Sequence, residues 1–214
     1  MPVYKIPKHP TSCNYFLVDS NFLANKFLKP DSFHNAGEKD RIQKCQEWWT
    51  EIDRQMKRNK GKVYVTELCI AETFKVLAKK NFEAGIFKYP SSYRQARERL
   101  SKFLHMSPKQ LRSHKRHVRC HDIDTNRDIV ISVDRCFEKL FKMKKKKQVR
   151  SDPGIVDLML LATEKYLLDF YGLTKRNLFI ISADGSLCKL AKSFPDLPRT
   201  VNPLHSKVTK VFDG

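Results

Sequence analysis

Short apolar runs alternate along the chain with longer segments in which apolar residues recur every three or four positions. The short runs predict buried strands at 15–18, 62–65 and 178–182, with weaker strand signals at 118–124 and 199–201. The longer segments predict amphipathic helices between these strands. Strands that alternate with helices are typical of an α/β domain with a parallel sheet, and this is the fold class that the pattern indicates.

Helix boundaries follow from the apolar spacing and from capping residues. Thr66 and Thr125 are the expected N-caps of two helices, and Asp152 with Pro153 is the expected start of another. Alternate residues from 129 to 133 are apolar as well, so the segment after Thr125 also fits a strand. The expected helices cover 20–28, 38–56, 66–80, 125–141, 153–162 and 185–194.

The length of 214 residues fits one domain, so we expect 1–214 to form a single unit. Segment 81–116 is rich in Tyr, Phe, Arg and Lys in a roughly helical pattern, and we interpret it as a basic helical insertion. Segment 142–150 contains a run of lysines and is interpreted as a Lys-rich loop.

A net charge of +19 predicts attraction to a polyanion, with nucleic acid preferred over membrane. No apolar stretch approaches the roughly 20 residues that span a bilayer, and the N-terminal residues lack the apolar centre of a signal peptide. We therefore expect a cytoplasmic protein that binds nucleic acid. The six cysteines are scattered and form no CxxC pair, which favours buried thiols over disulfides.

Two other cofactor classes receive little support from the sequence. His114, His117 and Cys120 are spaced three residues apart, as zinc ligands can be, but no second ligand pair accompanies them. A basic surface is the preferred interpretation of that segment. The seven glycines form neither a dinucleotide-binding GxGxxG nor a P-loop.

Acidic residues end two of the apolar runs. Asp19 follows the first run in the segment FLVDSNFL, and Asp184 follows the run at 178–182. Helix capping is the simple explanation for each residue alone. If the two strands are parallel neighbours, both acids lie at the carboxyl edge of the sheet, where open α/β folds place their sites.

Two acids on predicted helices belong to the same group. Asp157 is the only charge in the apolar segment IVDLMLLA, so we expect it to be largely buried and to be paired, metal-bound or protonated. A partner Lys or Arg is the structural alternative. Glu72 lies early in the helix after 62–65, near the same sheet edge. Glu67 lies on a different helix face, five residues earlier, and suits a helix-dipole role.

Four acids at one sheet edge repel each other, and a hard divalent cation removes the conflict. Mg²⁺ or Mn²⁺, as one ion or two, prefers oxygen ligands and can orient and polarise a phosphodiester. The expected chemistry is therefore phosphodiester hydrolysis. The candidate catalytic residues and metal ligands are Asp19, Glu72, Asp157 and Asp184.

The order of these segments resembles that of the PIN-domain nucleases, including the toxin ribonucleases of toxin–antitoxin pairs. The matching segments are FLVDSNFL, TELCIAETFKVL, DPGIVDLMLLATEKYL and LFIISADGSLCKLA, which contain the four acids. The resemblance covers about residues 14–80 and 117–202. It implies a three-layer α/β/α PIN-like fold with a short parallel sheet and the activity of a metal-dependent endoribonuclease.

The resemblance also implies supporting residues and partners. Asn21 and Ser182 would support the acidic pocket, and Asp152 would be an additional acid. Family members often form homodimers, and many are inhibited by a protein partner. A homodimer and an antitoxin are thus expected alongside RNA.

Positive charge is concentrated in two segments near the acids in sequence: residues 94–119 carry +8 and residues 139–150 carry +7. A basic rim would offset the repulsion between an acidic site and phosphate, although a merely solvated loop is the plain alternative. Interleaved aromatic residues, such as Tyr89, Tyr93 and Phe103, and also His105, can stack on bases or pack in the core. The candidate nucleic-acid-binding residues are Arg112, Lys115, Arg116, Arg119, Lys144, Lys145, Lys146, Lys147 and Arg150.

Two alternatives to an RNA-cleaving enzyme stay open. One is a catalytically silent PIN-like module that binds RNA and keeps the acids for structure. The other is a DNA-directed nuclease of the same fold family.

Overall fold

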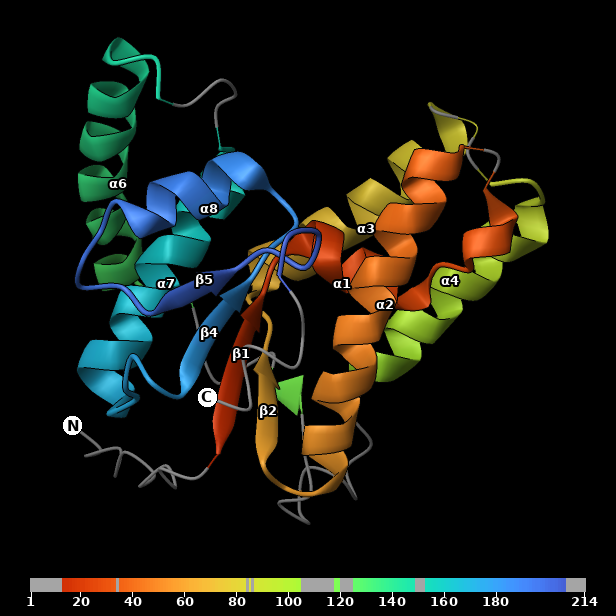
Figure 1. Ribbon diagram of the computed structural model, residues 1–214, viewed down its shortest axis with the longest axis horizontal. Coiled ribbons are helices and arrows are strands. Elements are labelled where there is room, and N and C mark those ends of the chain that lie inside the picture. Colours follow the sequence, from red (N-terminus) through yellow and green to blue (C-terminus); the bar gives the residue numbers. More distant parts are fainter. Residues whose placement is uncertain are drawn as a thin grey trace.

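A parallel sheet of five strands lies between two groups of helices, so the protein is a three-layer α/β/α structure (Figure 1). This computed structural model describes residues 13–33, 35–83, 85, 87–104, 118–119, 125–148 and 153–206. The fold class expected from the sequence is confirmed. Among the described residues, no helix combines the length and the apolar composition that crossing a membrane requires.

The strand order is β3-β2-β1-β4-β5, with β1 at the centre. All five expected strands are present, although they are short. Strand β2 begins at Gly61, one residue before the expected start; glycine suits this position because a Cβ there would lie 2.9 Å from the Gln55 Cβ. The strands are β1 (Asn14–Val18), β2 (Gly61–Tyr64), β3 (Val118–Arg119), β4 (Leu178–Ile181) and β5 (Arg199–Val201).

The first group of helices covers one face of the sheet and comes from the first half of the chain. Thr66 caps α3 as expected, with its side-chain oxygen accepting from the Cys69 amide at 3.2 Å. Trp49 of α2 stacks on Phe22 of α1 with ring centroids 4.8 Å apart, which joins these two helices. This group comprises α1 (Ser20–Phe27), the 3₁₀ turn η1 (Pro30–Ser32), α2 (Ala36–Lys57), α3 (Glu67–Phe82) and α4 (Pro90–Leu104).

The second group covers the opposite face and comes from the second half of the chain (Figure 1). It comprises α6 (Arg127–Lys145), α7 (Ile155–Tyr171) and α8 (Gly185–Lys192). The segment 129–133, which also fits a strand by its pattern, is helical. The lysine run begins within the last turn of α6 and continues past its end at Lys145.

Two expected N-caps are wrong. Asn126, and not Thr125, caps α6, because its side-chain oxygen accepts from the Ile129 amide at 3.0 Å. Helix α7 begins at Ile155 after Gly154, and Asp157 reaches back to the Gly154 amide at 2.9 Å. A side chain inside the helix thus satisfies this amide, and Pro153 lies outside the helix.

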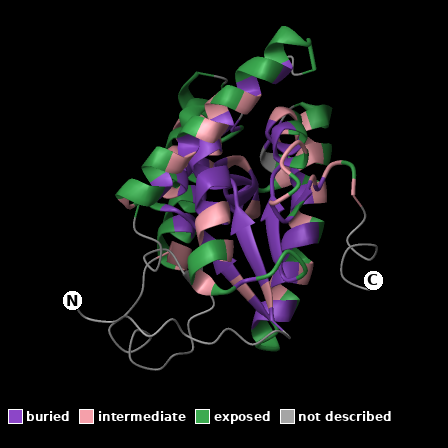
Figure 2. Cartoon of the chain, turned by 90° about the vertical axis from the view of Figure 1, so that its left-hand side faces the viewer, coloured by how far each residue is buried: buried purple, intermediate pink, exposed green. Residues whose placement is uncertain are grey.

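The sheet is enclosed by both groups of helices, and strands β1, β2, β4 and β5 are mostly buried (Figure 2). The cysteines contribute to this core as expected. Within the described part of the chain, Cys13, Cys45, Cys69, Cys136 and Cys188 are buried and form no disulfide. Cys120 lies outside the described residues.

The strand order makes β1 a topological switch point. From β1 the chain builds outward to β2 and β3 through α1–α4, and it then returns to the other side of β1, where β4 and β5 follow α6 and α7. Helices that follow β1 and β4 therefore diverge to opposite faces of the sheet. A crevice forms between such strands at their carboxyl ends, and open α/β folds bind ligands there.

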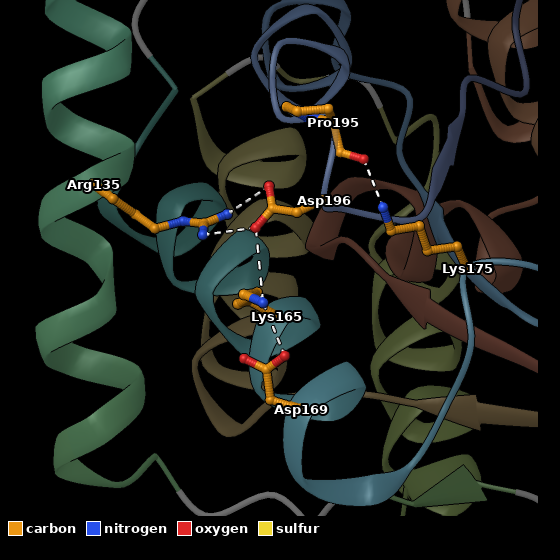
Figure 3. Close-up of polar contacts among 6 residues, drawn as sticks. All are labelled: Arg135, Lys165, Asp169, Lys175, Pro195 and Asp196. Atoms are coloured by element: carbon orange, nitrogen blue, oxygen red, sulfur yellow. Dashed lines mark hydrogen bonds and ion pairs between the residues drawn. The ribbon is translucent and has the colours of Figure 1, made fainter.

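Charged residues join the second group of helices on its outer side (Figure 3). Arg135 of α6 donates to both oxygens of Asp196, at 2.9 and 3.3 Å, and the Lys165 ammonium of α7 lies 3.8 Å from the same carboxylate. Lys165 also donates to Asp169 at 2.8 Å. Nearby, Lys175 donates to the Pro195 carbonyl at 2.6 Å, which fixes the loop that carries Asp196.

The acid that is fully buried in α7 is Glu164, whose exposure is 0%. Neither of its carboxyl oxygens has a hydrogen-bond partner among the described residues. Burial raises the pKa of Glu164 well above its ordinary value, and the negative charge of Asp196 adds to this rise. Burial therefore favours the protonated form of Glu164.

We expect Glu164→Leu to stabilise the protein, because it removes a buried carboxyl group that has no hydrogen-bond partner among the described residues. The raised pKa means that the folded state holds a proton that the unfolded state releases above about pH 4.5. The wild-type free energy of unfolding therefore falls as pH rises, and the Leu variant gains about 2 kcal/mol or more at pH 8. Urea unfolding at pH 5, 6.5 and 8 measures this difference.

Glu164→Gln is the matched control, since it keeps the size and polarity but cannot titrate. Its free energy of unfolding should depend less on pH than that of the wild type, and at pH 5 the two should have similar stability. A Leu variant less stable than wild type at all three pH values would show that Glu164 has a stabilising partner.

Candidate functional site

Asp19 lies at the switch point because the β1–β4 register places it there. Val18 pairs with Ile181, so the next residues, Asp19 and Ser182, face each other at the carboxyl ends of the strands. The Asp19 amide donates to the Ile181 carbonyl at 3.1 Å. The Ser182 hydroxyl donates to the Asp19 Oδ2, and the Phe22 amide donates to its Oδ1 at 2.5 Å. Asp19 is 2% exposed and held on both oxygens.

Ser182 connects Asp19 to the second acid of the strand ends. Its hydroxyl oxygen accepts a hydrogen bond from the Asp184 amide at 3.0 Å, and the same hydroxyl donates a hydrogen bond to Asp19. The Asp184 Oδ1 accepts from the amides of Ser186 and Leu187, at 2.6 and 3.1 Å, and so caps α8. Asp19 caps α1 in the same way. Both acids are helix caps and neighbours at one edge, so the two explanations of their placement are compatible.

Glu72 comes to this edge through a contact between α1 and α3. The Ser20 hydroxyl donates to the Glu72 Oε2 at 2.6 Å. Thr73 supports the same junction, since its hydroxyl lies 3.3 Å from the Ser20 carbonyl. Glu67 is exposed in the first turn of α3, as expected from the helix geometry.

Asp157 reaches the site from the opposite layer, at the N-terminal end of α7. Its side chain is half-buried, so the burial expected for Asp157 is present in part. It stands at the third position of its helix, at the open end, whereas Glu164 lies two turns deeper on the same side. The Gly154 amide, at 2.9 Å from the Asp157 Oδ2, orients the carboxylate.

The charges of neighbouring acids act on Asp157 and on Asp19. Burial raises the pKa of Asp157 to about 7 against the effect of the Gly154 hydrogen bond, and the charges of Asp19, Asp184 and Glu72 raise it further. Burial likewise raises the pKa of Asp19 to about 6, partly offset by the Ser182 and Phe22 hydrogen bonds. The structure therefore brings the acids from β1, α3, α7 and the β4–α8 junction into one electrostatic environment.

Two further residues, Arg41 and Cys69, interact electrostatically with these acids. Arg41 of α2 lowers the pKa of Asp19 by its positive charge. Burial raises the pKa of the Cys69 thiol to about 12, and the charges of Asp19, Glu72 and Asp157 contribute to this rise.

The site provides the right donors for a divalent cation without the closed geometry of a metal centre. Carboxylate oxygens are the ligands that Mg²⁺ and Mn²⁺ prefer. Within the described ranges, however, no three Asp, Glu, His or Cys side chains lie close enough together to hold an ion. The four acids are near enough to interact electrostatically, and they would need to move closer to share an ion.

The expected supporting and basic residues are only partly within the described structure. Lys144, Lys145, Lys146 and Lys147 are exposed at the end of α6. Asn21 is half-buried in the first turn of α1. Arg119 lies in β3. Asp152, Arg112, Lys115, Arg116, Arg150, and the zinc-like His114, His117 and Cys120 lie outside the described residues.

The aromatic residues near the basic segments divide into packed and exposed ones. Tyr93 is buried, and Phe103 packs against Phe27 at 5.4 Å between ring centroids, so these rings serve the core. Tyr89 is 54% exposed. His105 lies outside the described residues.

The sequence interpretation missed Ser20 and Arg41 as parts of the site. Ser20 follows Asp19 directly, but its link to Glu72 depends on the packing of α1 against α3, which no local pattern reveals. Arg41 lies 22 positions after Asp19 in an ordinary amphipathic helix, and nothing in the sequence distinguishes it.

Comparison with known proteins adds little to this geometry. A scan against protein-family models finds no match, and a search of curated proteins finds no significant one. The chain is similar to the crystal structure of VapBC2 from Rickettsia felis bound to a DNA fragment from their promoter, with 12% sequence identity and a TM-score of 0.47. The alignment covers 88% of this chain and 98% of that chain. A likeness at this level supports no conclusion about activity.

We expect Asp157→Asn to stabilise the metal-free protein at pH 8 and to have little effect at pH 4. The raised pKa of Asp157 means that ionisation of this group opposes folding, so the wild type loses stability as pH rises through about 7. Asn can still accept from the Gly154 amide but carries no charge. The gain at pH 8 should be on the order of 1 kcal/mol, allowing for solvent screening of a half-buried group.

Unfolding in urea with a chelator present, at pH 4, 6 and 8, measures the effect. Asp169→Asn is the matched control, because Asp169 is exposed near the other end of α7 and pairs with Lys165. An Asp157→Asn variant that loses stability at pH 8 would contradict the mutual repulsion of the acids.

Proposed function

We propose that this protein is a divalent-metal-dependent endonuclease that hydrolyses phosphodiester bonds, with RNA as the substrate. The observation that carries the proposal is the convergence of Asp19, Glu72, Asp157 and Asp184 at the switch point of the sheet. Acids of like charge at one edge repel each other and so destabilise the fold, and their collection there is explained best by a ligand that needs them.

The four carboxylates are the residues that would hold Mg²⁺ or Mn²⁺, as one ion or two. When bound, such an ion would polarise the phosphodiester and lower the pKa of a water molecule to make it a nucleophile. The remaining residues orient the carboxylates. Ser182 and the Phe22 amide fix Asp19, Ser20 fixes Glu72, and the Gly154 amide fixes Asp157.

Phosphate must approach this acidic edge against its charge, so the chain needs positive charge nearby. The overall +19 provides a long-range attraction for a polyanion. The exposed lysines at the end of α6 offer contacts for the phosphates on either side of the cleaved bond. RNA, rather than DNA, follows from the resemblance of the four acidic segments to the PIN-domain ribonucleases. A homodimer and an inhibitory antitoxin are further proposals from that resemblance.

One observation favours a second candidate, a silent module that binds RNA without cutting it. No three of the described acidic side chains are close enough to hold an ion together. A protein of this kind would bind RNA tightly and leave it intact with Mn²⁺ present.

We expect Asp157→Asn and Glu72→Gln each to lower Mn²⁺-dependent cleavage of a labelled RNA by at least 100-fold, because each removes a ligand charge for the ion. Glu67→Gln is the matched control for Glu72→Gln on the same helix, and it should retain activity. Circular dichroism and thermal melting confirm that the variants are folded.

Full activity of Asp157→Asn would contradict the proposed site. Tight RNA binding by the wild type without cleavage, over a range of RNAs, would establish the silent module instead. Faster cleavage of a DNA strand than of an RNA strand of matched sequence would establish a DNA-directed enzyme.

A further inference from the structure

Helix α6 exposes an aromatic ring where its lysines begin. Phe137 and Phe141 are one turn apart, with ring centroids 6.4 Å apart and ring planes 18° from parallel. Phe137 is half-buried and packs against the core, whereas Phe141 is 59% exposed. Core packing therefore explains Phe137 but leaves most of the Phe141 ring in water.

Lysines surround this exposed ring. Lys142, Lys144, Lys145, Lys146 and Lys147 are all exposed. The Lys144 ammonium lies 5.7 Å from the centroid of the Phe141 ring, and Glu138 pairs with Lys142. Crowded positive charges repel one another, so a ligand that binds here must be strongly anionic and must also have an apolar face for the ring.

We propose that Phe141, supported by Phe137 and surrounded by the lysines of residues 142–147, binds unpaired nucleotides, with a base stacked on the ring and phosphates on the lysines. We call these residues the α6 stacking surface. Aromatic rings beside lysines bind single strands in this way with little sequence preference. The inference deepens the proposed function by naming the form of the substrate, a single strand, and the residues that bind it.

The α6 stacking surface is poorly suited to an anionic membrane. An amphipathic helix at a membrane surface needs a continuous apolar face. The other exposed apolar residues of α6, Val130 and Ile131, lie ten or more positions before Phe141, and the acids Asp134 and Glu138 are exposed between them. Phe141 is thus an isolated ring among charges, which fits one base better than a lipid bilayer.

The position of the surface suits a substrate of the acidic site. The C-terminal end of α6 lies toward the same end of the molecule as the carboxyl ends of the strands (Figure 1). Only residues 149–152 separate Gln148 from Pro153, so the Cα atoms of these two residues are at most about 18 Å apart, and α7 begins two residues after Pro153. Asp157 is in the first turn of that helix. A strand of several nucleotides can therefore contact the ring and the acids together.

The test measures binding alone, in EDTA, so that it does not depend on cleavage. A fluorescein-labelled oligouridine of 12 nucleotides and a 12-base-pair RNA duplex are titrated with wild type, Phe141→Ala and Phe141→Trp. Phe141→Ala should weaken binding of the single strand by about 5-fold or more and leave the duplex unaffected, because duplex bases are already stacked. Phe141→Trp should retain the affinity, and its added fluorescence should be quenched by the single strand.

Two controls separate stacking from charge and from folding. Phe170→Ala removes another exposed phenylalanine ring, which is 50% exposed near the C-terminal end of α7. This change should alter the affinity for neither the single strand nor the duplex. Replacing Lys144, Lys145, Lys146 and Lys147 with Gln should weaken the binding of both the single strand and the duplex. It should reduce the slope of log affinity against log salt for the single strand by about 3.

Equal affinity of Phe141→Ala and wild type for the oligouridine would overturn the inference, as would an equal loss for the duplex. A response of Phe141→Trp to vesicles of phosphatidylserine, without a response to RNA, would assign the surface to a membrane instead. If substitution of Phe141 has no effect on RNA binding but Asp157-dependent cleavage is observed, the α6 stacking surface is refuted and the proposed function stands. If Phe141 contributes to single-strand binding but no RNA is cleaved, the α6 stacking surface stands and the proposed nuclease function is refuted.

Discussion

The pairing of β1 with β4 is the constraint on which the candidate site depends. These strands are neighbours in space although some 160 residues separate them, and their register sets Asp19 opposite Ser182. One hydroxyl then connects Asp19 to the backbone of Asp184. A shift of one residue in this register would turn Asp19 or Ser182 toward the other face of the sheet and separate the acids. The short central strands thus determine the chemistry as well as the core.

The layers of the fold were predictable from the sequence because strand and helix periodicities differ and the strands here are uniformly apolar. Helix ends were less predictable. Thr125 and Asn126 are adjacent residues of similar capping ability, and only the final turn geometry selects Asn126. At α7, Asp157 satisfies the Gly154 amide from within the helix, so no polar residue is needed at the cap itself.

The four acids could be predicted to lie at one edge because three of them follow or begin elements whose direction the parallel sheet fixes. The degree to which each acid is buried could not be predicted. An apolar window around Asp157 suggested enclosure; burial does raise the pKa of Asp157, but its place in the first turn of α7 leaves the side chain half-buried rather than fully buried. Glu164, with leucines three and four residues away on both sides, carries the stronger burial signal. Contacts made by Ser20 and Arg41 arise from helix packing and have no local signal at all.

Asp19 and Asp184 each serve two purposes, since each caps a helix with oxygens that also face the shared edge. Asparagine fulfils the first purpose nearly as well as aspartate and cannot fulfil the second. In the proposed nuclease, exchanging one for the other would remove a ligand charge while the architecture survives. If the proposed function holds, descendants of such a chain could lose their activity in a single evolutionary step and persist as well-folded proteins that still bind nucleic acid.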